Sequence, residues 1–305
     1  MNAEWTTADI PDQTGRTFMV TGANSGLGLE TARAVAARGA RVVMTVRSEE
    51  KGRAAAADII STAPDADLEV RRLDLADLDS VKAFAADYDG HLDVLVNNAG
   101  IMIPPRRLTK QGHESQFGTN HLGHFALTGL LLDRLGKGQH PRVVTVSSLA
   151  HLSGRIHFDD LTGERSYGPV RYYEQSKFAN MLFTLELDRR LRAAGSPVRS
   201  LAAHPGFSDT QLMQSANALV RAAGKVVMPF VTQSAAAGAL PQLYAATDPR
   251  AEGGQYFGPG GRRERKGWPV LVQPAPTAED PGTAKRLWEL SETLTGVRFP
   301  LTAAA

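Results

Sequence analysis

TGANSGLG, residues 21–28, joins the apolar run Phe18-Met19-Val20 to a helical pattern that continues to Arg38. A glycine-rich turn between a strand and a helix exposes backbone N–H groups and the positive end of the helix, and both favour a phosphate. The glycine spacing departs from the G-x-G-x-x-G of the commonest dinucleotide fingerprint. Because glycine clusters also form ordinary loops, the rest of the chain must decide between a dinucleotide site and a plain turn.

Apolar runs that are typical of strands alternate with helical patterns along the chain. The expected strands are 18–21, 42–46, 68–73, 92–96, 142–147 and 198–203, and the expected helices are 27–38, 49–61, 77–84, 118–135 and 173–194. Ser48 and Asp77 are the expected N-caps of the second and third helices. This alternation predicts an α/β fold, a doubly wound (Rossmann) parallel sheet with helices on both faces.

The length of the chain and its lack of linker-like segments favour a single domain. A chain of 305 residues fits one large α/β domain or two small ones, and 42% hydrophobic residues are enough for a large core. Neither a linker-like segment nor an internal repeat divides the sequence. We expect a core at about 15–260, a substrate lid at about 207–228 and a C-terminal tail at about 259–305.

Charge and composition exclude several classes of protein. With 34 basic and 32 acidic residues, the net charge of +2 gives no general electrostatic case for nucleic acid or anionic lipid as partner. The absence of cysteine excludes disulfides, thiolate metal sites and thiol nucleophiles. Residues 1–13 lack the features of a signal peptide, and no apolar stretch is long enough to span a bilayer. We expect a cytoplasmic protein and leave peripheral membrane association open.

Two side chains at strand ends bear on the choice of cofactor. Arg47 follows the second strand, where dinucleotide folds usually carry the acidic residue that binds the ribose 2′-OH. A guanidinium suits a 2′-phosphate instead, so NADP(H) is favoured and NAD(H) is the alternative. Arg47 is otherwise a solvated residue that pairs with Glu49 or Glu50. Asp74 ends the third strand and either binds an adenine amino group or caps a turn.

Other polar residues are expected at the same edge of the sheet. Residues 97–100, Asn-Asn-Ala-Gly, end the fourth strand and either admit a ribose close to the backbone or form a simple turn. Ser147 and Ser148 close the fifth strand, and Asn120 lies in the helix after the fourth. A hydroxyl can hold a substrate oxygen, and an amide can hold a water that relays protons.

Tyr173 and Lys177 are the residues most suited to chemistry. Four residues apart on a helix, they share a face, so the phenol and the ammonium can point at one site. A tyrosine titrates near ~10, and a nearby cation is expected to lower its pKa enough for acid–base work close to neutral pH. Taken alone, this spacing more often marks a surface pair.

Taken together, these motifs resemble those of the short-chain dehydrogenase/reductase family. They follow the family's order: residues 21–28, 97–100, Asn120, Ser148, Tyr173 with Lys177, and Pro205-Gly206. The resemblance covers roughly residues 15–260. Residues 117–125, 146–151 and 153–161 are further similar to the retinol dehydrogenase and WW-domain oxidoreductase branch.

The resemblance implies hydride transfer between NADP and an alcohol or carbonyl compound. Tyr173 would be the general acid/base, and Lys177 would bind the nicotinamide ribose and lower the pKa of Tyr173. Ser148 would orient the substrate oxygen, and Asn120 would anchor a proton relay. The predicted cofactor-binding residues are Gly22, Asn24, Ser25, Gly26, Leu27, Gly28, Arg47, Asp74, Leu75, Asn98, Ala99, Gly100, Tyr173, Lys177, Pro205 and Gly206.

The sequence departs from this branch at two places. After Pro205-Gly206 the chain reads Phe-Ser-Asp-Thr, so the hydroxyl contact to the cofactor carboxamide falls to Ser208 or Thr210. The hydrophobic N-terminal anchor of many retinol-active relatives is missing, which favours another lipophilic carbonyl over retinol. The gap from Ser148 to Tyr173 is longer than in compact family members, and the insertion is expected to shape the substrate mouth.

The remaining patterns concern metal binding, assembly and functions other than catalysis. His121 and His124 are three residues apart, but no carboxylate or thiolate converges on them, so we expect no metal. Relatives often pair through the helices that carry Asn120 and Tyr173, so a homo-oligomer is open, with a solvated face at 189–192 as the alternative. The alternative to an enzyme is a silent NADP(H)-binding sensor or an interaction protein.

Overall fold

The computed structural model describes residues 4–207 and 233–301. Its strands are β1 Thr17–Thr21, β2 Arg41–Val46, β3 Leu68–Arg72, β4 Val94–Asn97, β5 Arg142–Val146, β6 Arg199–Ala203, β7 Tyr256–Pro259 and β8 Pro269–Val272. Its α-helices are α1 Gly26–Ala36, α2 Glu49–Thr62, α3 Leu78–Asp87, α4 Ser115–Phe117, α5 Gly123–Leu135, α6 Pro169–Ala193, α8 Ala235–Thr247 and α9 Pro281–Thr295. The predicted lid lies outside the described residues except for Phe207.

One sheet contains the described strands in the order β3-β2-β1-β4-β5-β6-β7-β8. Strands β1 to β7 run parallel, and β8 pairs antiparallel with β7. The predicted doubly wound fold is confirmed. The β7–β8 hairpin was not predicted, because the segment around residue 258 carries no clear strand period.

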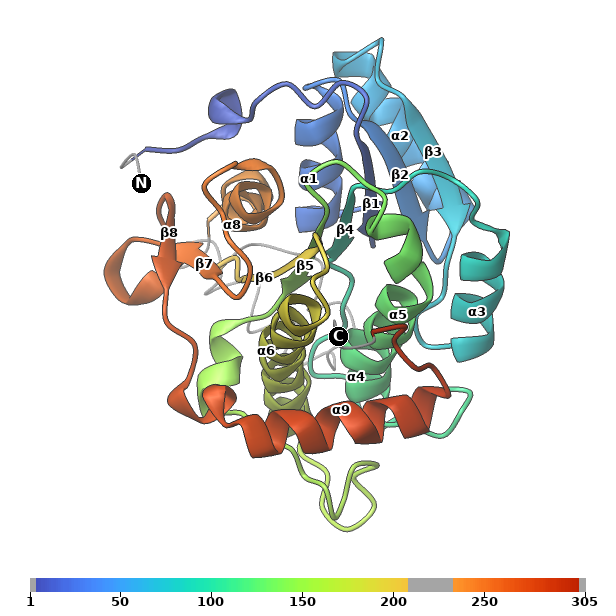
Figure 1. The fold of residues 1–305 in the computed structure, drawn as a ribbon, viewed down its shortest axis with the longest axis vertical. Helices are drawn as coiled ribbons and strands as arrows, with labels where there is room; N and C mark the ends of the chain where they lie inside the picture. Colours follow the sequence, from blue (N-terminus) through green and yellow to red (C-terminus); the bar gives the residue numbers. More distant parts are fainter. Residues whose placement is uncertain (1–3, 208–232, 302–305) are drawn as a thin grey trace.

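Alternating residues of the strands face two separate layers of helices (Figure 1). In β1, Phe18 and Val20 pack with α1, α2 and α8, whereas Met19 packs with α3, α5, α6 and α9. The period of two residues along a strand produces this division. Because both faces are covered, the central strands β1, β4 and β5 are buried along their whole length, whereas the edge strand β3 is half-buried and carries charged residues.

Local signals explain where most helices begin. The Ser48 hydroxyl accepts from the backbone N–H of Lys51, and Asp77 caps α3 by accepting from the N–H of Asp79, as predicted. Helix α6 begins at Pro169 rather than at the predicted 173, because proline is well tolerated at the first helical position. The helix predicted at 118–135 begins at Ser115 and contains a π-helical turn at 118–122.

Helix α9 covers the outer faces of α5 and α6 (Figure 1, red). Trp288 of α9 is 2% exposed, and its ring centroid lies 5.1 Å from that of Phe125 in α5. The Arg190 guanidinium lies 4.4 Å above the Trp288 ring, so this arginine is a packing residue rather than part of a purely solvated face. Helix α9, within the predicted tail, thus belongs to the core.

Candidate active site

The glycine turn fits tightly between β1, α1 and the loop after β4. Gly22 and Gly26 adopt positive φ angles of 68° and 55°. A Cβ placed on Gly28 would lie 2.5 Å from Asn98 Nδ2 and 2.5 Å from the backbone oxygen of Gly22, so a side chain is excluded there. Ser25 stands at the N-cap of α1 but makes no side-chain cap bond. The start of α1 therefore offers backbone N–H groups to an anion, which suits a dinucleotide pyrophosphate.

The predicted loop at 97–100 is tied to this turn. The Thr21 hydroxyl accepts from the backbone N–H groups of Asn98 and Ala99, each at 2.9 Å. The Asn98 amide donates to the backbone oxygen of Thr21 at 2.7 Å. The two segments therefore form one rigid wall at the carboxyl edge of the sheet.

The predicted adenosine-side residues differ in their surroundings. Arg47 is exposed after β2, and within the described ranges it forms no ion pair with Glu49 or Glu50; Glu49 pairs with Arg53 at 3.0 Å instead. Asp74 Oδ1 accepts from the N–H of Ala76 at 3.0 Å, so the expected turn cap is formed. The other members of the predicted cofactor set here are Leu27 and Leu75, which are buried, and Asn24 and Ser25, which are half-buried.

Tyr173 meets Ser148 across the gap between α6 and the end of β5. Tyr173 is 8% exposed, and burial raises the pKa of its phenol to about 12 while the hydrogen bond with Ser148 acts in the opposite direction. Lys177 Nζ lies 5.8 Å from the centroid of the Tyr173 ring and donates to the backbone oxygen of Val146 at 3.0 Å. Burial lowers the pKa of Lys177 to about 8.

The expected effect of Lys177 on Tyr173 is therefore not what the structure shows. The pKa of Tyr173 is shifted upward, because loss of solvation dominates. The helical spacing correctly predicted that the two residues share one face of α6. The Lys177 ammonium, however, donates its hydrogen bond to the Val146 carbonyl. The degree of burial, which depends on tertiary packing, decided the direction of the shift.

Asn120 joins the loop after β4 to α6. Its Oδ1 accepts from the N–H of Ile101 at 2.9 Å, and its Nδ2 donates to the Ser176 hydroxyl at 2.9 Å. A Cβ placed on Gly100 would lie 3.2 Å from Asn120 Oδ1 and 3.8 Å from Lys177 Nζ. Asn120 and Lys177 thus both lie next to Gly100. Lys177 is on the face of α6 that also carries Tyr173.

Two buried histidines connect segments of this site by hydrogen bonds that the sequence did not indicate. His124 Nδ1 donates to the backbone oxygen of Asn120 at 2.9 Å, and Nε2 accepts from the Thr21 hydroxyl at 2.9 Å. Burial lowers the pKa of His124 to about 4, so the ring is neutral. His151 Nδ1 donates to the backbone oxygen of Ser148 at 2.7 Å and accepts from the N–H of Ala275 at Nε2. Their burial among distant segments is what defines these roles.

Metal binding finds no support in the described part of the chain. His121 is buried beside Phe117 and Phe125, and its Nε2 lies 2.8 Å from the Ser291 hydroxyl of α9. Across residues 4–207 and 233–301, no group of three or more histidine or acidic residues is arranged to hold a metal ion. Within the same ranges, no helix is long and apolar enough to cross a membrane.

The Pro205-Gly206 turn is held by the β7–β8 hairpin. Gly206 has a φ of 63°, and a Cβ on it would lie 2.3 Å from the backbone oxygen of Arg265. The N–H of Phe207 donates to that same oxygen at 3.0 Å. Ser208 and Thr210, the predicted contacts to the cofactor carboxamide, lie outside the described residues.

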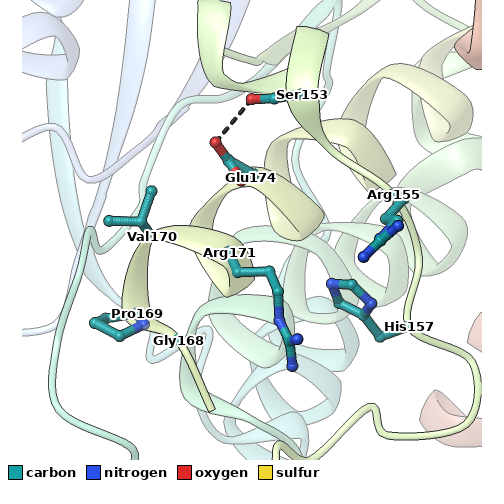
Figure 2. Close-up of a pocket in the computed structure, with 8 residues that line it drawn as sticks. All are labelled: Ser153, Arg155, His157, Gly168, Pro169, Val170, Arg171 and Glu174. Carbon is teal, nitrogen blue, oxygen red and sulfur yellow. Dashed lines mark hydrogen bonds between the residues drawn. The ribbon is translucent and has the colours of Figure 1, made fainter. Parts of the chain in front are cut away.

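A cavity of about 600 Å³ lies beside the start of α6 (Figure 2). The insertion between Ser148 and Tyr173 and the start of α6 line it, with Ser153, Arg155 and His157 from the insertion and Gly168, Pro169, Val170, Arg171 and Glu174 from the helix start. Glu174, next to Tyr173 in sequence, accepts from the Ser153 hydroxyl at 2.7 Å at one side of this cavity. The insertion therefore forms part of a cavity beside the helix that carries Tyr173.

A sheet of this order, with an anion-ready turn at its first helix and polar residues at its carboxyl edge, defines a dinucleotide-binding α/β protein. Residues 16–220 match the family described as short chain dehydrogenase. Human retinol dehydrogenase 13 is 40% identical over 304 residues, which cover 96% of this chain and 87% of that protein. Mouse polyprenol dehydrogenase is 40% identical over 94% of this chain and 86% of its own length.

Solved structures agree with this similarity. A crystal structure from Mycobacterium paratuberculosis is 49% identical, with a TM-score of 0.83, and the match covers 98% of this chain and 100% of that one. The chain belongs to the short-chain dehydrogenase/reductase family and is an oxidoreductase. The predicted resemblance to retinol dehydrogenases is confirmed by these relatives.

Proposed function

We propose that the protein transfers a hydride between NADP(H) and a lipophilic alcohol or carbonyl compound, with Tyr173 as general acid/base. The observation that carries this proposal is the placement of the Tyr173 phenol beside Ser148, next to the buried Lys177. Two relatives are named for retinol and polyprenol, which are both alcohols with long hydrocarbon chains. We also propose a cytoplasmic location, on the composition of the chain alone.

The chain's own residues divide the work around the reacting oxygen. When bound, the nicotinamide supplies or accepts the hydride. The Ser148 hydroxyl holds the substrate oxygen, and Tyr173 exchanges a proton with that oxygen. Because its pKa is raised to about 12, the phenol is protonated at neutral pH, which suits donation to a carbonyl oxygen during reduction. Lys177 is positively charged below its pKa of about 8 and can bond the ribose hydroxyls.

Consumption of NADPH by the purified protein tests this function. We would assay retinoid, steroid, quinone and medium-chain aldehyde substrates, and follow NADPH binding by fluorescence in parallel. Turnover of a substrate from this panel supports the proposed oxidoreductase function. Tight binding of NADPH without turnover on the whole panel would favour the alternative, a silent NADP(H)-binding sensor.

Arg47→Ala is expected to weaken NADPH selectively. Loss of a charge-assisted hydrogen bond costs about 1.5–3 kcal/mol, so KM for NADPH should rise by about tenfold or more while KM for NADH stays constant. Arg53→Ala is the matched control, because Arg53 is an exposed arginine of α2 that pairs with Glu49. Equal changes for the two cofactors, or a wild-type preference for NADH, would contradict the assignment of Arg47 to a 2′-phosphate.

A further inference from the structure

The cavity beside α6 is lined by the first turns of the helix that carries Tyr173. Val170, which lines the cavity and is 52% exposed, precedes Tyr173 by three residues, so the two side chains lie on the same side of α6. Pro169 also lines the cavity, and four residues of helix correspond to only about 6 Å along the axis. A substrate held near Tyr173 can therefore extend into this cavity.

Two arginines of the lining have no acidic partner. Arg155 is exposed and Arg171 is half-buried, and neither forms a salt bridge with any carboxylate of the described ranges. Arg171 is already held in place, because it donates to the backbone oxygen of Ser166 and its guanidinium lies 5.4 Å from the Tyr172 ring centroid. The cavity lining thus carries two arginines against one carboxylate, that of Glu174, and one of the arginines is an ordered side chain.

His157 adds a neutral donor between these arginines (Figure 2). Its ring packs against Tyr172 at 5.7 Å, and its Nε2 is buried with no hydrogen-bond partner among the residues that the structure describes. Burial lowers the pKa of His157, and the charges of Arg171 and Arg155 lower it further, against a smaller effect of Asp160. The surroundings of the ring are therefore positive, and a neutral imidazole can donate one N–H to an anion through Nδ1, which, unlike Nε2, is not among the buried unpaired atoms.

The backbone contributes to the same potential. Helix α6 has 25 residues and begins with Gly168 at the N-cap, which supplies no side-chain cap. The N-terminal end of a helix carries a partial positive charge, and its first N–H groups attract oxyanions. The acidic residue of the lining is Glu174, whose carboxylate already accepts from the Ser153 hydroxyl at the opposite side of the cavity.

We propose that this cavity binds a carboxylate at the far end of the substrate. The preferred substrate would then be an aldehyde or ketone with a hydrocarbon chain and a terminal acid, oriented by Arg155, His157 and Arg171 while its carbonyl oxygen meets Ser148 and Tyr173. This inference rests on the proposed function and narrows its substrate class. It distinguishes this chain from relatives that are named for neutral alcohols.

Azelaic semialdehyde and its methyl ester form a matched pair for the test, because they share one chain and one aldehyde and the ester replaces the terminal carboxylate by an uncharged group. With NADPH, the wild-type protein is expected to prefer the acid by about tenfold or more in kcat/KM, as expected for hydrogen bonds to a charged group. Arg171→Gln should reduce this preference to about one, and Arg171→Lys should keep part of it. Arg155→Gln should also reduce it, and an exposed arginine can be replaced without loss of the fold.

Arg165→Gln is the control variant. Arg165 is an exposed arginine of the same insertion that does not line the cavity, so its removal should leave the preference for the acid unchanged. A wild-type protein that does not distinguish acid from ester would overturn the proposal. An equal loss for both substrates in Arg171→Gln would overturn it as well, because the effect would then be structural.

Calorimetric titration with azelate separates this inference from the proposed function. Azelate has two carboxylates and no carbonyl group to reduce, so its binding does not depend on turnover. Binding of azelate to wild type but not to Arg171→Gln supports the carboxylate site. If no aldehyde is turned over at the same time, only the proposed reaction fails. Turnover of neutral aldehydes without binding of azelate would overturn the proposed carboxylate site and leave the proposed reaction supported. Tighter binding of inorganic phosphate than of azelate would overturn the choice of a carboxylate.

Discussion

Tyr173→Phe is expected to lower kcat by about a thousandfold, within the range of 10²–10⁴ that general acid–base catalysis contributes. The variant loses only the hydroxyl that bonds Ser148, and the ring stays in its buried position. NADPH affinity should therefore stay within about twofold of wild type. Steady-state NADPH consumption and fluorescence titration measure the two quantities separately.

Tyr172→Phe is the matched control for this variant. Tyr172 is the neighbouring buried tyrosine, and its hydroxyl donates to the backbone oxygen of Asp160 rather than to Ser148. Its loss should affect stability slightly and leave the chemical step in place. Substantial turnover by Tyr173→Phe, or an equal loss in both variants, would show that Tyr173 is not the general acid/base.

Trp288→Ala is expected to lower the free energy of unfolding by about 3–5 kcal/mol, the range for large-to-small changes at buried aromatic residues. Trp288 packs against Phe125, and its ring centroid lies 4.5 Å from that of Phe299 near the C-terminus. The Arg190 guanidinium covers another side of the ring at 4.4 Å. Chemical denaturation followed by circular dichroism measures the change.

Trp268→Ala provides the comparison for a tryptophan at the surface. Trp268 is 42% exposed, so its replacement should change the free energy of unfolding by about 0.5 kcal/mol or less. If Trp288→Ala were equally mild, α9 would not be part of the core. The C-terminal tail would then be dispensable for the fold. That result would favour the alternative of an interaction protein, in which the tail binds a partner.

Several parts of the candidate site were predictable because they depend on local patterns. Residues 21–28 and 97–100 follow strands that the apolar runs identify, and parallel strands bring their carboxyl ends to one edge. Tyr173 and Lys177 are related by helix geometry alone. The family motifs then connect Ser148 and Asn120 to the same site, and the structure brings all four catalytic candidates into one region.

Other features depend on contacts between residues that are far apart in sequence. His124 joins Thr21 to Asn120, and His151 joins Ser148 to Ala275, yet neither histidine carries a local signal for these partners. The antiparallel strand β8 has an irregular pattern, because its burial comes from a hairpin with β7.

The sequence by itself determined the alternation of strands and helices from β1 to β6, the glycine turn, and the residue types that can carry hydride-transfer chemistry. These depend on periodicity and spacing, which are local properties of the chain. Only the tertiary structure decided that α9 covers α5 and α6, that burial raises the pKa of Tyr173, and that Arg155 and Arg171 share a cavity. Burial and long-range proximity arise when segments distant in sequence pack together, so periodicity and spacing do not specify them.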